Sequence, residues 1–236
     1  MTFRPLPDRI LTKVSARPRR PRPPEFGRSK FGRKAAGLAL LVALAASSNP
    51  GSATAGSAGD TVQGLYNTLL VTMKNGSTLG ESGRYAQLAP VIRRSFDLPT
   101  MARLSVGPTW VELTPAQQQQ VTESYGRYVS AIYADRFNSY NGQKLQVTDA
   151  VPSTGGIMVR SRIIKANGEP VEVDYMMRQE AGSWLISDVY LDGTISEIAT
   201  RRSEFAAIVR NQGVDGLIVA LNRKADMLTG TTARAD

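Results

Sequence analysis

The sequence predicts an α+β protein in which N- and C-terminal helices pack on an antiparallel four-stranded meander sheet around one apolar pocket. This prediction rests on two changes in the spacing of apolar residues along the sequence. Apolar residues recur every three or four positions between residues 62 and 140, and every second position between 145 and 191. Helical spacing then returns from Ile198 to Met227. The expected order is therefore helices, strands, helices.

The N-terminal 55 residues have the features of a secretory signal peptide with a long basic segment. Residues 1–34 are rich in Arg and Pro, a twelve-residue apolar run ends at Ala46, and an A-x-A cleavage site ends at Ala55. At about 1.5 Å per residue the run spans roughly 18 Å, too short for a bilayer core of about 30 Å. The alternatives are an uncleaved anchor or a buried helix. We expect a cleaved leader, a domain at 56–229 and a disordered tail at 230–236.

The composition excludes several classes of function. The chain has no Cys and no His, so thiol nucleophiles, His-based triads and zinc sites with thiolate or imidazole ligands are excluded. Residues 1–46 hold 11 of the 29 basic and 2 of the 20 acidic residues, so the remainder carries 18 of each. A neutral body lacks the positive surface of a nucleic-acid binder. We expect no nucleic-acid partner, no metal and no cofactor.

The helical part divides at Gly, Pro and capping residues. Apolar spacing predicts a first helix from Val62 to Met73, and the Gly/Ser-rich residues 76–83 a flexible link before a second helix. Asp97 is a candidate N-cap for a third helix. Thr114-Pro115-Ala116-Gln117 has the pattern of a capping box with Pro at the first helical position. The aromatic stripe that follows reaches Tyr140, and we expect this long helix to lie on the sheet and wall the pocket.

Four strands are predicted at 145–151, 157–164, 171–177 and 184–191, joined by short Gly-containing turns typical of an antiparallel meander. In the last strand, alternation places Trp184, Ile186, Asp188 and Tyr190 on one face. The chain then turns at Asp192-Gly193 into a helix with Ser196 as its N-cap.

Two strand carboxylates, Asp174 and Asp188, are the candidates for acid–base chemistry. A carboxyl group in an apolar pocket has a raised pKa and can act as a general base, which leaves open an isomerase or dehydratase. A strand Asp is more often paired with Arg or bonded to backbone N–H groups, and we expect Asp188 and Arg202 to form a structural or headgroup-binding pair. A structural protein without a cavity is the third alternative.

Several short motifs occur in an order similar to that of one protein family. They are FDLPTMARLSVGPTWVELTPAQQQQV at 96–121, WLISDVYLDG at 184–193 and RSEF at 202–205. The chain resembles the MlaC / toluene-tolerance family of periplasmic lipid-carrier proteins, and the spelling DGTISEIATRRSEF is most similar to the hopanoid-associated HpnM branch. Relative to the lipid-carrier pattern, the chain has one extra residue between Gly193 and Arg202, and Arg201 in place of Tyr.

The resemblance implies a periplasmic carrier that binds a hopanoid or phospholipid and shuttles it between membranes with an ABC-type inner-membrane transporter, in transient contact with membrane proteins. It implies no catalysis. From periodicity, the expected lipid-binding residues come from the third helix and its following segment, the long helix and the sheet: Met101, Leu104, Trp110, Tyr125, Val129, Ile132, Tyr133, Phe137, Tyr175, Met177, Trp184, Ile186 and Tyr190.

Overall fold

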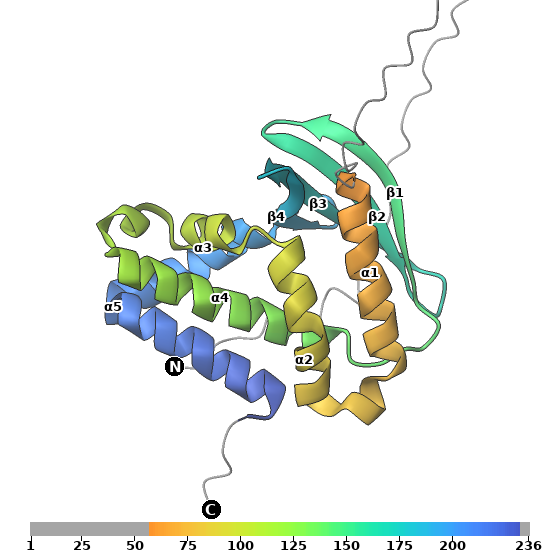
Figure 1. The fold of residues 1–236 in the computed structure, drawn as a ribbon, viewed down its shortest axis with the longest axis horizontal. Coiled ribbons are helices and arrows are strands. Elements are labelled where there is room, and N and C mark those ends of the chain that lie inside the picture. The colour runs from red at the N-terminus through yellow and green to blue at the C-terminus, as the bar shows by residue number, and fades with distance from the viewer. Residues whose placement is uncertain (1–56, 232–236) are drawn as a thin grey trace, which may run out of the picture. The chain divides into compact units, whose positions relative to one another are not determined.

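The computed structural model describes residues 57–231, and the predicted signal peptide and residues 232–236 of the predicted tail lie outside this range. Four α-helices and a 3-10 helix come first, then five strands, then one long helix (Figure 1). The N-terminal elements are α1 Ala58–Lys74, α2 Gly76–Ser95, α3 Leu98–Val106, η2 Gly107–Glu112 and α4 Pro115–Arg136. The remaining elements are β1 Lys144–Ser153, β2 Gly156–Ile164, β3 Pro170–Glu180, β4 Ser183–Leu191, β5 Ile195–Ser196 and α5 Glu197–Thr229.

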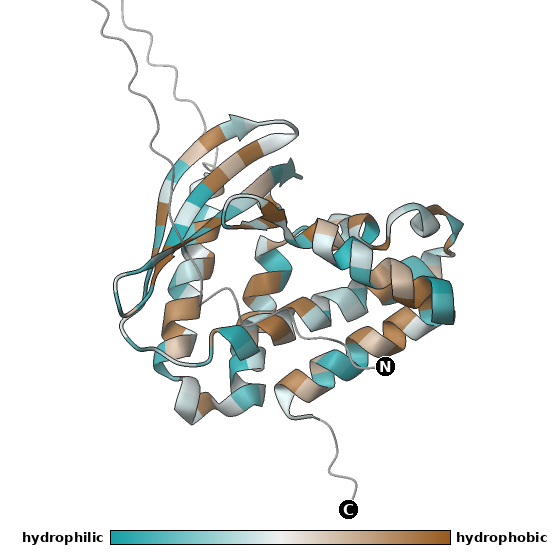
Figure 2. Ribbon diagram, turned by 180° about the vertical axis from the view of Figure 1, so that it is seen from behind, coloured by the Kyte–Doolittle hydropathy of each residue, from teal (hydrophilic) through white to brown (hydrophobic). Residues whose placement is uncertain are grey.

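The sheet is an antiparallel meander in the order β1-β2-β3-β4-β5, which confirms the α+β class. The prediction of four strands is wrong by one. The fifth strand is only Ile195–Ser196, which pairs with Leu191 and Tyr190 across the Asp192-Gly193 turn. Two residues are too few to give a period-two pattern in the sequence. Figure 2 shows apolar and polar residues alternating along the long strands.

Helix starts follow the local sequence. Thr114 and Gln117 form the predicted capping box: the Thr114 hydroxyl accepts from Gln117 N–H, and the Gln117 side chain accepts from Thr114 N–H. Asp97 caps α3 by accepting from the N–H of Thr100, and Ser196 caps α5 by accepting from Ala199. These short-range predictions are confirmed because each depends on residues within one helical turn.

Two predictions fail near glycines and at a helix end. The supposed flexible link 76–83 is helical, with one break at Gly80, whose φ of 62° and ψ of −172° suit only glycine. A glycine also interrupts α5, because Gly213 has a non-helical φ of 69° and ψ of −176°. Helix α4 ends at Arg136, four residues before Tyr140, because Phe137 leaves the helical conformation as the C-cap.

Helix α1, and not α4, lies on the sheet. It packs against β1, β2 and β4, and the strands curve around it (Figure 1). Helix α4 instead packs against α2, α3 and α5. Small buried residues of α4 explain this arrangement, because they let neighbouring helices approach closely: Ser124, Gly126, Ser130, Ala131 and Ala134. A Cβ atom on Gly126 would lie 3.0 Å from the Leu98 side chain of α3. The prediction that the long helix covers the sheet is therefore wrong.

Candidate functional site

We call the face of the sheet that meets α1 the inner face. Tyr175 of β3 identifies it, because its ring lies edge-on to Tyr66 of α1 at 5.9 Å between centroids. Strand pairing places Val159 of β2 opposite Tyr175, and Ile186 of β4 opposite Met177, so these side chains share that face. All of them are buried. The inner face is thus an apolar surface covered by a helix.

A β-bulge at Ser187 divides β4 between the two faces of the sheet. Met177 pairs with Ile186 and Met176 with Asp188, so Ser187 has no partner residue. The bulge shifts the alternation by one residue, and Val189, not Tyr190, lies opposite Tyr175. The prediction that Asp188 and Tyr190 share a face with Trp184 and Ile186 is therefore wrong. Asp188 and Tyr190 lie on the outer face.

A cluster of hydroxyl groups interrupts the apolar inner face. The tyrosine cluster consists of Tyr66 from α1, Tyr133 from α4 and Tyr175 from β3. The Tyr66 hydroxyl lies 2.5 Å from the hydroxyl of Ser161 in β2. The hydroxyl groups of Tyr66 and Tyr133 interact electrostatically with that of Tyr175. Burial raises the pKa of all three tyrosines, so their hydroxyls stay protonated at neutral pH.

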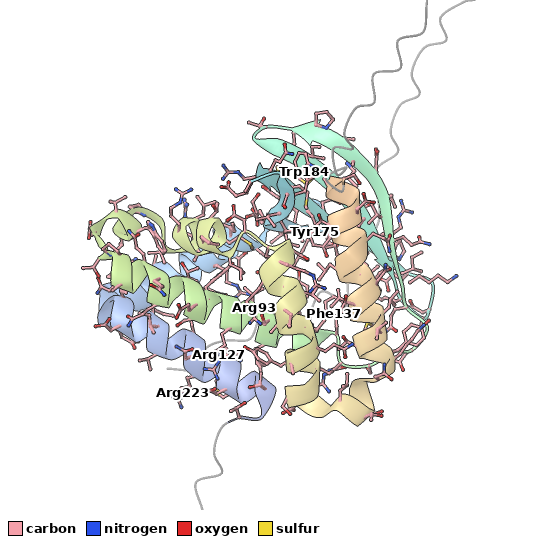
Figure 3. The ribbon with its side chains drawn as sticks, viewed as in Figure 1. Arg93, Arg127, Phe137, Tyr175, Trp184 and Arg223 are labelled. Carbon is pink, nitrogen blue, oxygen red and sulfur yellow. The ribbon has the colours of Figure 1, made fainter. Side chains whose placement is uncertain are left out.

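Aromatic rings connect this cluster to the end of α4. Phe96 packs edge-on against Tyr133 at 5.5 Å, and Phe137 stacks on Tyr133 at 5.6 Å. Tyr133 and Phe137 are half-buried, whereas Tyr175 is buried. Figure 3 labels Tyr175 at the sheet and Phe137 close to the end of α4. The aromatic series therefore leads from the protein surface to the inner face.

The structure brings some of the predicted lipid-binding residues together. Tyr133 and Phe137 of the α4 end meet the inner-face residues through Tyr175, and Met177 and Ile186 are neighbours on the sheet. Trp184 is half-buried, and the alternation of β4 up to the bulge places it on the inner face with Ile186. These residues remain candidates for contact with a ligand.

Other predicted residues lie elsewhere. Tyr125 is buried between α4 and α5, with its ring 6.2 Å from that of Phe205. Val129 and Met101 are buried on α4 and α3, which pack on each other. Three other predicted residues are half-buried: Leu104, Trp110 and Ile132.

Asp188 and Arg202 do not pair with each other. The Asp188 carboxylate accepts from the Ser196 hydroxyl at 2.6 Å and from the N–H of Ile198 at 3.2 Å, at the start of α5. The Arg202 Nε donates to the carbonyl of Leu104 at 2.8 Å. The negative charge of Asp188 therefore lies at the N-terminus of α5, where it interacts favourably with the helix dipole.

The neighbouring Arg201 is the buried member of the arginine pair. It forms ion pairs with Glu197 at 3.2 Å and Glu204 at 2.7 Å, and its guanidinium lies over the ring of Tyr128. These contacts hold the first turns of α5 against α4.

The second candidate carboxylate, Asp174, also lies on the outer face, opposite Tyr190. Its Oδ1 accepts from the N–H of Ser161 at 3.4 Å, and burial raises the pKa of the carboxyl group. Asp174 and Asp188 therefore lie on the face of the sheet opposite to the tyrosine cluster, although the charge of Asp174 helps to raise the pKa of Tyr66. Between residues 57 and 231, no group of acidic side chains is arranged to hold a metal ion.

Sequence reasoning missed Ser161 and Tyr66 as members of the site. Ser161 had a signal: it is the polar residue between Val159 and Ile163 on the alternating apolar face of β2. Tyr66 was part of the apolar stripe of the first helix, but nothing local showed that this helix would cover the sheet. Within the described part of the chain, no helix is long and apolar enough to cross a membrane.

Two comparisons with known proteins give the same fold. The family model described as MlaC protein matches residues 63–223. A solved structure of a phospholipid-binding protein from Ralstonia solanacearum, in complex with a phospholipid, superposes with a TM-score of 0.61. The two sequences are 24% identical, and the match covers 73% of this chain and 99% of that one. This structural likeness shows a shared fold.

Proposed function

The chain belongs to the MlaC family, and on this premise we propose that it is a periplasmic carrier that shields a lipid from water. The observation that carries the proposal is the apolar inner face of the sheet, which α1 and the end of α4 cover with aromatic side chains. The lipid would occupy the layer between this face and the helices. The Ralstonia protein of the same fold, with its bound phospholipid, supports a phospholipid as one cargo.

Solvation is sufficient for this function. Each buried CH₂ group contributes about 0.8 kcal/mol, so a sixteen-carbon chain in water is unfavourable by about 13 kcal/mol. An apolar layer removes most of this cost without any covalent step. The outer-face positions of Asp174 and Asp188, each bonded to protein N–H groups, agree with a role in the fold.

The finer features of the proposal rest on the sequence. The signal peptide at 1–55 would direct the protein to the periplasm, where a carrier requires a partner at each membrane. We propose an ABC-type inner-membrane transporter as one partner. The DGTISEIATRRSEF segment supports membership of the HpnM branch, and with it a hopanoid as the alternative cargo to a phospholipid.

Mass spectrometry of the purified protein tests the carrier proposal. The protein should be expressed with its own signal peptide, purified from the periplasmic fraction and extracted with organic solvent. We expect about one molecule of phospholipid or hopanoid per protein molecule. The protein from which the lipid has been removed should take up the same lipid from vesicles. A protein that is repeatedly isolated empty and takes up no lipid would refute the proposal.

A pair of tryptophan variants locates the binding site. Met177→Trp enlarges a buried side chain of the inner face, whereas Val111→Trp enlarges one that is 84% exposed on η2. We expect Met177→Trp to carry much less lipid than Val111→Trp. Overpacking a core costs about 1–3 kcal/mol, so thermal unfolding must first show that both variants are folded. Equal lipid content in the two folded variants would place the lipid elsewhere.

A further inference from the structure

The short helix η2 carries the most exposed large apolar side chain between residues 57 and 231. Val111 is 84% exposed, and its neighbour Trp110 is half-buried. The segment between α3 and α4, which contains η2, forms a loop at the end of the helical part away from α1 (Figure 1). The chain enters this segment at Gly107, whose φ of 78° and ψ of −144° end α3. One exposed apolar residue is common in proteins, so the surroundings of Val111 decide its role.

The main-chain acceptors at the end of η2 are satisfied within the protein. The N–H of Leu113 donates to the carbonyl oxygen of Trp110 at 3.3 Å, and the side-chain amide of Gln118 donates to the same oxygen at 3.1 Å. The Gln118 amide also donates to the carbonyl of Leu113 at 3.4 Å. Main-chain groups without partners oppose transfer out of water. These two carbonyls can therefore leave bulk water with Trp110 and Val111 and keep their hydrogen bonds.

Two arginines beside η2 have guanidinium groups available to an anion. Arg202 of α5 lies against the start of η2, because a Cβ atom on Gly107 would be 3.5 Å from its Nε. That Nε donates to the carbonyl of Leu104, and the Nη groups of Arg202 have no partner among residues 57–231. Arg103, one turn before Gly107, is exposed and also forms no ion pair within this range. The acidic residue of this segment is Glu112, so two positive charges accompany one negative charge.

An anionic membrane surface fits this arrangement better than a protein surface does. Tryptophan is favoured at the boundary between lipid headgroups and hydrocarbon, and basic side chains are attracted to anionic lipids. A guanidinium group can also bind a phosphate through two parallel hydrogen bonds. A stable protein interface takes about 20–30 residues from each partner. Helix η2 has six residues, so its apolar side chains suit a small contact with lipid.

We propose that η2 is a membrane-docking tip: Val111 and Trp110 enter the headgroup layer of an anionic bilayer, and Arg103 and Arg202 bind lipid phosphates beside them. The inference rests on the proposed carrier function, because a carrier has to approach a bilayer to exchange its lipid. It adds a surface that is separate from the inner face of the sheet. Binding of this kind increases with the apolar area buried and with the attraction to anionic lipids. Two apolar side chains and two cations give a reversible contact, from which a carrier can leave.

Co-sedimentation with protein-free vesicles tests the tip. The purified protein should bind vesicles of phosphatidylglycerol and phosphatidylcholine more tightly than vesicles of phosphatidylcholine alone. Val111→Ser should weaken binding about tenfold, because the apolar methyl groups that enter the headgroup layer are lost. The matched control is Val71→Ser on α1, where the side chain is 48% exposed, and this variant should bind as the parent does. Equal binding of the two serine variants would overturn the proposal.

Charge variants test the contribution of the arginines. Arg103→Gln should weaken binding to the anionic vesicles about fivefold and leave binding to the neutral vesicles unchanged. Arg93→Gln removes the same charge from an exposed position on α2 (Figure 3), and its effect should be much smaller. Glu112→Gln should strengthen binding to the anionic vesicles, because it removes a repulsive charge. Equal losses in the two arginine variants would show that net charge governs binding, against a specific role of η2.

Tryptophan fluorescence reports insertion directly. The chain has two tryptophans, so Trp184→Phe leaves Trp110 as the source of the emission. We expect the emission maximum to move to shorter wavelength on anionic vesicles, because the indole ring leaves water. An unchanged maximum in vesicle-bound protein would show that η2 does not enter the headgroup layer.

The lipid content of the purified protein separates failure of this inference from failure of the carrier proposal. Protein that contains lipid but sediments with neither kind of vesicle would overturn the docking tip alone, and would point to a protein as the partner of η2. Protein that is isolated without lipid and takes up none, but sediments with anionic vesicles through η2, would refute the carrier proposal alone.

Discussion

The guanidinium Nε of Arg84 in α2 donates to the main-chain carbonyl of Ala134, in the last turn of α4, at 2.9 Å. Its Nη1 donates to the carbonyl of Gly76 at 3.1 Å. Arg84 is 8% exposed, so one buried cation joins the start of α2 to the end of the helix that carries Tyr133. A positive charge at a helix C-terminus is stabilising, because the carbonyl end of the helix dipole is negative.

Arg84→Met should lower the free energy of unfolding by about 2 kcal/mol, because two carbonyls lose a charged donor in a buried site. Urea unfolding measures the change. Arg93→Met is the matched control on the same helix, where the side chain is exposed (Figure 3), and its effect should stay within about 0.5 kcal/mol. Equal losses in the two variants would show that the Arg84 hydrogen bonds contribute nothing specific.

Arg201→Met should destabilise the protein by about 3 kcal/mol, because Glu204 would lose its ion-pair partner and Glu197 would keep only its contact with Arg136. Arg202→Met removes an exposed side chain and one hydrogen bond to Leu104, and should cost about 1 kcal/mol or less. Chemical denaturation of the two variants compares adjacent residues directly. A larger loss at Arg202 would contradict the assignment of Arg201 as the structural member of the pair.

Asp174 should make stability depend on pH. Burial raises the pKa of its carboxyl group above the ordinary value of 3.8. The folded chain therefore binds this proton more tightly than the unfolded chain. The contribution to stability is complete below the unfolded pKa and is lost as pH rises through the folded one.

Asp174→Asn removes this loss and keeps an oxygen that can accept from Ser161 N–H. We expect the variant to be more stable than the parent at pH 7, with a difference that shrinks towards pH 4. Urea midpoints at pH 7, 5.5 and 4 would measure it, with the exposed Asp135→Asn as control. A gain that increased as the pH fell would have the wrong sign and refute the assignment.

Two glycine-to-alanine changes should have opposite effects. Gly213 has a φ of 69° and a ψ of −176°, a conformation open essentially to glycine alone, so Gly213→Ala should cost about 1–3 kcal/mol. Gly64 lies within α1 and has open space where a Cβ would be, so Gly64→Ala should stabilise by about 0.5–1 kcal/mol. Thermal unfolding distinguishes the two signs. A stabilising Gly213→Ala would mean that α5 is continuous at this point.

Predictions that depend on neighbouring residues succeeded. The capping box at Thr114 and the N-caps at Asp97 and Ser196 are set within one turn, and the bounds of the four long strands lie within a few residues of the predicted ones. The helical residues 76–79 show the limit of the same reasoning. Glycine and serine disfavour a helix locally, but packing of α2 against α1 and α4 outweighs the propensity.

The candidate site depended on relationships that no local pattern contains. One bulge residue, Ser187, was enough to move Tyr190 to the outer face, because alternation has a period of two. Tyr66 and Ser161 are separated by 95 positions, and only the curvature of the sheet around α1 brings their hydroxyls together. The sequence could identify the apolar residues of the inner face, but not the contact between the Tyr66 and Ser161 hydroxyls among them.

The irregular edge strand β1 makes the protein less prone to aggregate at high concentration. β1 pairs only with β2 among the described strands, and its register shifts between Val147 and Asp149. Near its other end, Pro152 has no N–H group to offer. A second molecule can add to a sheet only along an uninterrupted row of donors and acceptors, and long flat edges are where aggregation begins. The bulge and the proline therefore protect the protein from edge-to-edge aggregation while leaving the face that meets α1 unchanged.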